Sequence, residues 1–342
     1  MESASATAAA ASFKQRRATW DVVSKYGLIA LLVAFPAYYA ISDVLAGDGL
    51  TRIATNLVAG VSNGSIWALV AIGYTLVYGI IELINFAHGD VFMIGSFVAF
   101  GLYGTFGLSL TTGVLNVMIE RVAYRPLRGA PKLAPLITAV GMSFILQNVG
   151  ILWVGGSQKG IPDLIDAQKQ LVEIAGVTIS RADVLAVAVT IPLVFLLTAF
   201  INGSRLGKAM RATAQDPEAA RLMGINVDTT ISLTFLLGGL LAGAAGLIYA
   251  LYQTQIWFFQ GFTAGLIAFT AAVMGGIGNI KGAVLGGFII GFIQQISDNR
   301  DEAFGFLPLG SEWTPAIVFI YLILIMTFKP SGLLGEQTRD AG

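Results

Sequence analysis

The residues best suited to chemistry in this sequence form one short polar stretch, Asn85 to Asp90, between two apolar segments. It holds the only histidine of the chain, His88, followed by Gly89 and Asp90. Ionisable groups at membrane depth are costly, so they usually face a bundle interior or an aqueous cavity. The stretch therefore fits a substrate pathway. It fits equally a tight cytoplasmic turn in which Asn85 and Asp90 cap helices and His88 bonds to a backbone carbonyl.

The remaining polar residues argue against catalysis by this chain. No nucleophile, base and acid are grouped as in a hydrolase, and neither a second histidine nor a carboxylate cluster accompanies His88 to form a metal site. The chain has no cysteine, which excludes thiol chemistry and disulfides. We therefore expect no enzymatic activity, no metal and no cofactor bound by this chain.

A glycine-rich break, Gly275 to Gly282, interrupts the last third of the sequence. It superficially resembles a phosphate loop, but the pattern GxxxxGK[ST] occurs nowhere in the chain, so we expect no Walker-type ATP site. Interrupted membrane helices expose backbone dipoles that can line a path. The candidate pathway residues here are Gly275, Gly276, Gly278 and Asn279. Other glycines spaced four apart, such as Gly60 and Gly64, indicate close helix packing.

The polar interval from Ser204 to Asp228 (residues 204–228) carries the signals of one short helix, Pro217 to Met223. Asp216 can cap it, Pro217 suits its first turn, Glu218 places negative charge at its positive end, and Gly224 suits the left-handed residue that ends it. Upstream, Arg205, Lys208 and Arg211 recur three apart and share one helical face, a pattern typical of a membrane interface. The alternative is a solvated loop that only joins two spans.

Composition indicates the environment in which these segments fold. The chain has 342 residues, of which 56% are hydrophobic and 12% charged, and its mean hydropathy is +0.77. Its formal net charge of zero argues against a nucleic-acid partner. Apolar runs of about 20 residues match a bilayer crossed by helices. We therefore expect an all-α polytopic membrane protein with about nine or ten transmembrane helices.

The cation-rich loops set the orientation, because cytoplasmic loops carry an excess of Lys and Arg. The loop from Ile119 to Lys132 and the interval 204–228 are therefore placed inside, as are the tails 1–26 and 329–342. The transmembrane domain covers residues 27–328. Thr105 to Ile119 is short for a crossing of about 20 residues. The other expected spans are Gly27 to Ala46, Asn56 to Ile81, Ile84 to about Tyr103, Leu133 to Val154, Arg181 to Ile201, Ile231 to Gln253, the pair Phe262 to Val273 and Ala283 to Gln295 around the break, and Trp313 to Phe328.

Four sequence runs carry a family resemblance: Tyr78 to Ser96, Ile119 to Gly129, Arg205 to Asn226, and Phe269 to Gly287. In this order they resemble the LivH-type permease subunit of branched-chain amino acid ABC importers, over Asn56 to about Gly335. The resemblance implies a multi-pass protein of the cytoplasmic (inner) membrane. Its implied partners are a LivM-type second permease, two cytoplasmic ATPase subunits that bind ATP and Mg, and an extracytoplasmic amino-acid-binding protein.

The same resemblance gives the interval 204–228 a role. Glu218, Ala219, Ala220 and Gly224 match the first half of the EAA motif of ABC importer permeases. The match implies that this helix docks on an ATPase subunit, through its residues Pro217 and Arg221 as well and with Arg211 and Asp216 just before it. The later I-x-L-P half is absent, and Gly104 to Ile119 is shorter than in the family. The expected cargo is branched-chain or hydrophobic amino acids. The alternatives are a permease of this family for urea, amides or other amino acids, or an ion-coupled secondary transporter.

Overall fold

The computed structural model describes residues 27, 33–45, 47, 49–102, 105–131, 133–163, 166–299, 302–303, 307–308 and 310–335. The predicted tail 1–26 and the end of the predicted C-terminal tail, 336–342, lie outside the described residues. Helices dominate the described chain, and strands occur only as short pairs in the described loops. The expectation of an all-α polytopic membrane protein is therefore confirmed.

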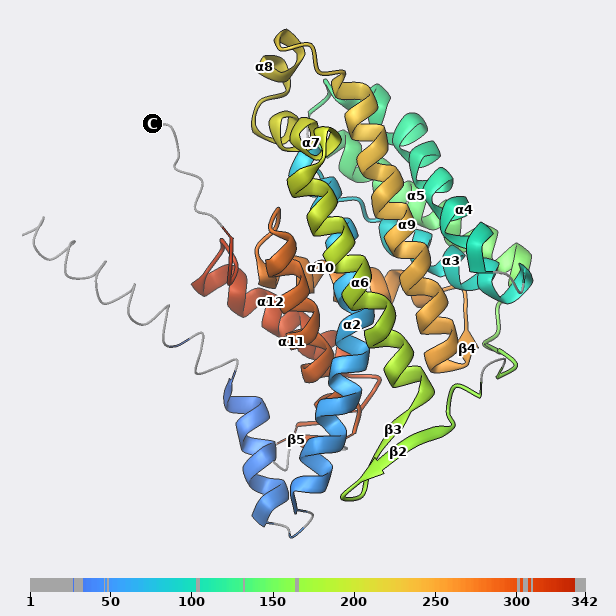
Figure 1. Cartoon of the computed structure of the whole chain (residues 1–342), viewed down its shortest axis with the longest axis vertical. Helices are drawn as coiled ribbons and strands as arrows, with labels where there is room; N and C mark the ends of the chain where they lie inside the picture. Colours follow the sequence, from blue (N-terminus) through green and yellow to red (C-terminus); the bar gives the residue numbers. More distant parts are fainter. Residues whose placement is uncertain are drawn as a thin grey trace, which may run out of the picture.

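The helices form a bundle that is elongated along the vertical direction of Figure 1. Five are long and apolar enough to cross a membrane, and three shorter apolar helices accompany them. The described helices are Val33–Leu45, α2 (Gly49–Ile81), α3 (His88–Leu102), α4 (Thr105–Ile119), α5 (Leu133–Val154), α6 (Arg181–Gly203), α7 (Arg205–Gln215), α8 (Pro217–Leu222), α9 (Val227–Gln253), α10 (Gln260–Gly275), α11 (Ile280–Asp298) and α12 (Thr314–Phe328).

The centre of the bundle is the pair formed by α2 and α11, which glycines bring into close contact. A Cβ added at Gly291 would overlap the backbone of Gly64, and one added at Gly64 would lie 2.8 Å from the Cα of Phe288. Without side chains at these positions the two backbones can approach closely. The four-residue glycine spacing thus marks helix packing here, as expected.

A second layer surrounds this pair. Helix α9 packs against α2, α3 and α4, whereas α5 and α6 are peripheral: 83% of the apolar window of α2 is buried, against 22% of that of α6. The outer helices expose large apolar side chains such as Phe144, Leu152 and Phe195. Such surfaces suit contact with lipid or a second membrane subunit.

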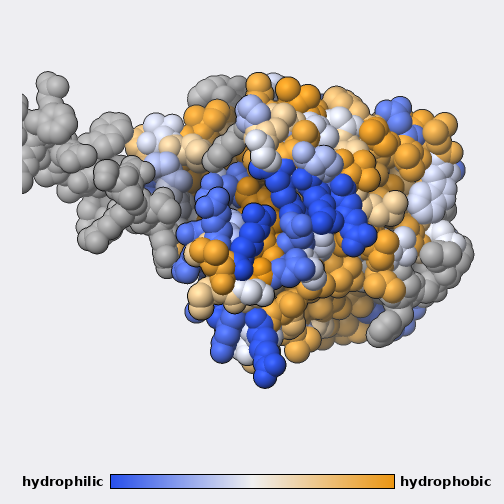
Figure 2. Space-filling model, turned by 90° about the horizontal axis from the view of Figure 1, so that it is seen from above, coloured by the Kyte–Doolittle hydropathy of each residue, from blue (hydrophilic) through white to orange (hydrophobic). Residues whose placement is uncertain are grey.

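The two ends of the bundle differ. Helices α7 and α8 lie at the top in Figure 1. Figure 2 looks down on that end and shows hydrophilic residues gathered there, with hydrophobic residues around them. At the opposite end, the antiparallel hairpin of β2 (Gln170–Ile174) and β3 (Val177–Ser180) lies in the loop between α5 and α6. Shorter pairs join β1 (Lys159–Gly160) to β4 (Gln255–Ile256), and β5 (Glu302–Ala303) to β6 (Leu307–Pro308).

The predicted span boundaries need corrections. The span expected from Ile84 begins only at His88, because α2 ends at Ile81 and Glu82 adopts φ +51°, so residues 82–87 leave the helix. Helix α9 begins at Val227 rather than Ile231, because the side chain of Asn226 accepts a 3.0 Å hydrogen bond from the backbone N–H of Thr229 and caps it.

Other predicted spans are longer in the structure than the sequence indicated. Helix α2 starts at Gly49 rather than Asn56, and the helices around the glycine break extend over Gln260–Gly275 and Ile280–Asp298. The short segment Thr105–Ile119 is helical and continues into a π-helical turn, η1 (Glu120–Tyr124), and a 3-10 turn, η2 (Arg125–Leu127). These turns extend the short helix at its C-terminal end.

Candidate coupling surface and transport pathway

Helix α7 is anchored at the C-terminal end of α6. Ser204 ends α6 and caps α7, its hydroxyl accepting a 2.9 Å hydrogen bond from the backbone N–H of Gly207. Gly207 lies so close to Ile201 that a Cβ would overlap that backbone, and the guanidinium of Arg211 donates to the carbonyl of Ile201. Displacement of α7 must therefore act on the end of α6.

Helix α8 has the boundaries that its caps predict. The carboxylate of Asp216 accepts hydrogen bonds of 2.9 Å from the backbone N–H groups of Glu218 and Ala219. At the other end Gly224 adopts φ +83°, and its N–H bonds to the carbonyl of Arg221 while the N–H of Ile225 bonds to that of Ala220. These two bonds form a Schellman motif. The helix ends at Leu222 with Met223 as its cap, one residue earlier than predicted.

The tip of α8 is an exposed apolar knob that the sequence analysis missed. Leu222 is 89% exposed and Met223 is 82% exposed, whereas Ala220 of the predicted motif is buried. Glu218, Ala219 and Arg221 surround the knob as exposed residues. Large apolar side chains at a polar end of a protein mark a contact surface. Their position could have indicated this exposure, because Leu222 and Met223 end a six-residue helix that lies between polar segments.

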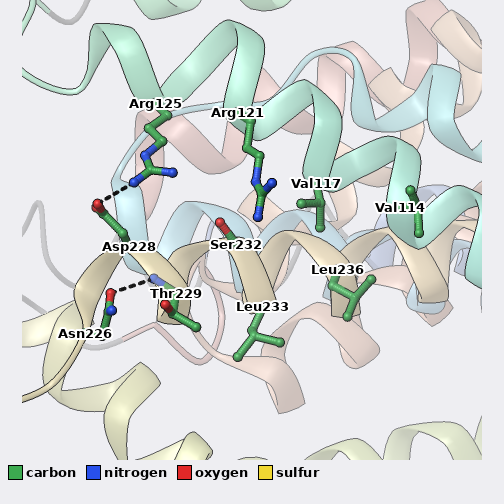
Figure 3. A pocket seen from close by; sticks show the side chains of 10 residues that line it. All are labelled: Val114, Val117, Arg121, Arg125, Asn226, Asp228, Thr229, Ser232, Leu233 and Leu236. Atoms are coloured by element: carbon green, nitrogen blue, oxygen red, sulfur yellow. Dashed lines mark hydrogen bonds and ion pairs between the residues drawn. The ribbon is translucent and has the colours of Figure 1, made fainter.

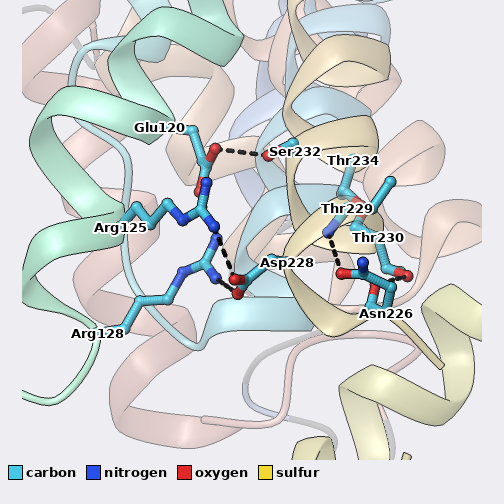
Figure 4. Close-up of polar contacts among 9 residues, drawn as sticks. All are labelled: Glu120, Arg125, Arg128, Asn226, Asp228, Thr229, Thr230, Ser232 and Thr234. Atoms are coloured by element: carbon cyan, nitrogen blue, oxygen red, sulfur yellow. Dashed lines mark hydrogen bonds and ion pairs between the residues drawn. The ribbon is translucent and has the colours of Figure 1, made fainter. Parts of the chain in front are cut away.

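An ion-pair network ties the next segment to the membrane domain (Figure 4). The fully buried carboxylate of Glu120 pairs with Arg128 and accepts a 2.7 Å hydrogen bond from the hydroxyl of Ser232. Arg128 also pairs with Asp228, and Arg125 reaches the same carboxylate at 2.8 Å. Removing the partner of a buried charge costs about 3–5 kcal/mol, which applies to Glu120 with Arg128. The pair of Arg125 with Asp228 is 48% and 42% exposed and contributes about 1 kcal/mol or less. The network therefore couples η1 and η2 firmly to the start of α9, directly after α8.

The structure places His88 and Asp90 deep inside the bundle, at the start of α3. Both side chains are fully buried. The ring of His88 meets that of Tyr74 edge-on with centroids 4.8 Å apart, and Gly89 packs on the backbone of α10. Ser143 and Gln147 of α5 approach the Asp90 carboxylate, and the backbone of Val70 approaches the His88 ring. Among the described residues, none of these contacts has ordinary hydrogen-bond geometry. Buried polar groups are nearly always satisfied, so these two have the character of a functional site.

Asn85 joins this region to the centre of the bundle through a polar chain. The hydroxyl of Tyr124 donates to Asn85 at 3.0 Å, Asn85 contacts Asn116 of α4 at 3.4 Å, and Asn116 donates to the carbonyl of Phe235 in α9 at 2.6 Å. The turn 82–87 is therefore held by η1, α4 and α9 together. Two of these elements, η1 and α9, also contribute residues to the ion-pair network.

The glycine break between α10 and α11 is covered by the segment that follows α12. The N–H groups of Leu333 and Leu334 bond to the carbonyls of Met274 and Gly275, each at 2.8 Å. The side chain of Asn279 donates to Leu334 at 2.8 Å and accepts from the N–H of Gly282 at 3.1 Å, capping α11. Gly276 and Gly278 adopt φ +109° and +91°, a conformation suited to glycine.

The two predicted pathway stretches both lie along the second half of α2. Phe86 meets Phe269 with ring centroids 6.3 Å apart, and a Cβ at Gly79 would lie 3.6 Å from the Cα of Gly278. Between them a cavity of about 10 Å³ is lined by Tyr74, Tyr78, Ile84, Phe269, Ala272 and Ile277. That volume admits one water at most, so this conformation is closed to an amino acid at that point.

Residues 56–326 match the family described as branched-chain amino acid transport system / permease component. The chain belongs to this permease family. It is 44% identical over 299 residues, 82% of this chain and 95% of the relative, to the high-affinity branched-chain amino acid transport system permease protein BraD of Pseudomonas aeruginosa.

Other relatives of this permease also align over most of their length. LivH of Escherichia coli K12, a high-affinity branched-chain amino acid transport system permease protein, is 41% identical over 296 residues, 81% of this chain and 94% of its own length. A probable branched-chain amino acid transport permease protein LivH of Methanocaldococcus jannaschii is 29% identical over 289 residues, 79% of this chain and 89% of its own. No solved structure matches the chain. The family match covers α8 and both candidate pathway stretches.

Proposed function

We propose that this permease subunit moves branched-chain amino acids across the cytoplasmic (inner) membrane as part of an ATP-driven importer. The observation that carries the proposal is the family match over residues 56–326, with relatives at 44% and 41% identity whose names specify branched-chain amino acid transport. The multi-helical membrane fold and the exposed α8 agree with this role.

The importer requires partners that supply energy and cargo. ATP and Mg are held by two cytoplasmic ATPase subunits, a second permease of the LivM type completes the membrane domain, and an extracytoplasmic binding protein delivers the amino acid. The knob of Leu222 and Met223 supports an ATPase contact, because it projects from the polar end of the bundle. The hairpin of β2 and β3 lies at the end where a binding protein would approach.

Coupling follows from the contacts behind α8. A push on α8 reaches α6 through Arg211 and Ile201, and it reaches α4 and α9 through Glu120, Arg128 and Asp228. Packed helices move as rigid bodies rather than deforming continuously. ATP binding and hydrolysis thereby rock α4 and α9 against the α2–α11 pair and alternate the open side of the pathway.

The pathway itself runs beside the second half of α2 in this proposal. Asn85, His88, Gly89 and Asp90 form one side, and Gly275, Gly276, Gly278 and Asn279 form the other. The unsatisfied His88 ring and Asp90 carboxylate support this assignment, because an amino acid or water entering between these segments would supply hydrogen bonds that the closed conformation lacks.

Substrate and energy source are tested together by transport. The complete importer in proteoliposomes should accumulate labelled leucine when ATP is supplied, and an excess of unlabelled isoleucine or valine should suppress uptake while urea should not. A reagent that dissipates proton and sodium gradients (an uncoupler) should leave uptake unchanged. Uptake of urea in preference to leucine would contradict the substrate, and uptake that stops with the uncoupler but survives deletion of the ATPases would favour an ion-coupled transporter.

A further inference from the structure

A groove on the side of the bundle, at its predicted cytoplasmic end, has no role in the transport function proposed above. It has a volume of about 440 Å³ and lies between α4 with η1 and the first turns of α9. Three residues matter most on this side of the groove: Val114 of α4, Arg121 of η1 and Arg125 of η2. Ser232 and Leu236 face them from α9 (Figure 3).

The cytoplasmic rim of the groove carries an excess of positive charge. The carboxylates of Glu120 and Asp228 balance the guanidinium groups of Arg125 and Arg128. Arg121, the third cation, makes no ion pair or hydrogen bond with any residue that the structure describes, and it extends from η1 into the space between the two helices. A cation left over beside a paired network is suited to an anionic ligand.

Below this rim the groove is apolar. Val114 lies seven residues before Arg121, which is two helical turns or about 10 Å deeper along the helix, and Leu236 lies at a similar depth on α9. Val114 is 47% exposed, and the adjoining Met118 and Val122 also expose apolar side chains. The groove thus continues onto an apolar outer surface.

We propose that this groove binds an anionic phospholipid of the cytoplasmic leaflet. Arg121, with the exposed part of Arg125, holds the phosphate, and one acyl chain lies along Val114 and Leu236. A soluble acidic peptide would match the cations but would leave the deep apolar half unfilled. Basic pockets between membrane helices on the cytoplasmic side commonly hold anionic lipid headgroups.

A cysteine-free chain allows a site-specific test. Met118→Cys, at the exposed edge of the groove, is labelled with a fluorophore in the full-length chain in nanodiscs, and quenching by brominated phosphatidylglycerol is compared with quenching by brominated phosphatidylcholine. One cation near a membrane surface favours an anionic lipid roughly five-fold, so phosphatidylglycerol should be preferred by about that factor. Inorganic phosphate should not remove the preference, because it has no acyl chain.

Matched variants decide the outcome. Arg121→Gln should abolish the preference, whereas Arg205→Gln, which removes an exposed cation of α7 outside the groove, should retain it. Val114→Trp, which fills the apolar half without changing charge, should also abolish it. Equal preference in Arg121→Gln and Arg205→Gln would overturn the proposal. The proposal would also be overturned if binding of the second permease removed quenching by both brominated lipids. That result would show that a protein helix covers the groove.

Discussion

The double substitution Leu222→Asp with Met223→Asp should reduce ATP-driven uptake of leucine more than ten-fold. Both side chains are almost fully exposed at the tip of α8, and central apolar anchors of an interface contribute about 2 kcal/mol or more each. A loss of about 1.4 kcal/mol already changes affinity ten-fold. Uptake is measured in proteoliposomes that contain the complete importer, together with the amount of ATPase subunit that copurifies.

A charge-matched control separates this effect from simple charge repulsion. Asn202→Asp with Gln215→Glu also adds two carboxylates to exposed positions of the cytoplasmic end, but away from the knob. This control should transport normally. If both double variants retained full uptake, or lost it equally, the knob would have no special role in coupling.

Gly291→Val should abolish most of the correctly folded protein. The new side chain would overlap the backbone of Gly64 in α2, and neither backbone can retreat because both helices lie at the centre of the bundle. Overpacking typically costs about 1–3 kcal/mol and occasionally more, and a clash with backbone belongs at the upper end. Thermal unfolding in detergent and the monodisperse fraction on gel filtration report the loss.

The same substitution on a peripheral helix provides the comparison. A Cβ added at Gly141 of α5 meets nothing within 4 Å, so Gly141→Val should leave the melting temperature within a few degrees of the unmodified protein. Equal melting temperatures for the two variants would mean that the α2–α11 contact is not the centre of the fold.

Local signals explain the features that the sequence could predict. Helix α8 is specified by residues inside or beside it, Asp216, Pro217 and Gly224, so its caps were predictable to within one residue. The break after Gly275 was predictable for the same reason. The start of α3 was predicted wrongly at Ile84 because hydropathy is continuous across residues 82–87, whereas the backbone turns at Glu82.

Long-range contacts explain what the sequence could not provide. Arg128 contacts Asp228, which lies 100 residues later in the chain. Through Arg128, Asp228 is linked to Glu120, which is still further away in the sequence. From the sequence, Arg125 and Arg128 indicated only that their loop faces the cytoplasm, and their carboxylate partners could not be predicted. Likewise, nothing local indicated that Leu333 and Leu334 cover the glycine break, or that Arg121 would lie beside a groove without an ion-pair partner among the described residues.

Cross-linking from the tip of α8 tests the central claim most directly. Met223→Cys, the only cysteine of the chain, is labelled with a photoreactive maleimide in the complete importer, and Leu171→Cys on the β2–β3 hairpin at the opposite end serves as the control. An adduct with the ATPase subunit is expected from position 223 and none from position 171. An intact complex that gives no ATPase adduct from position 223, or equal adducts from both positions, would contradict it.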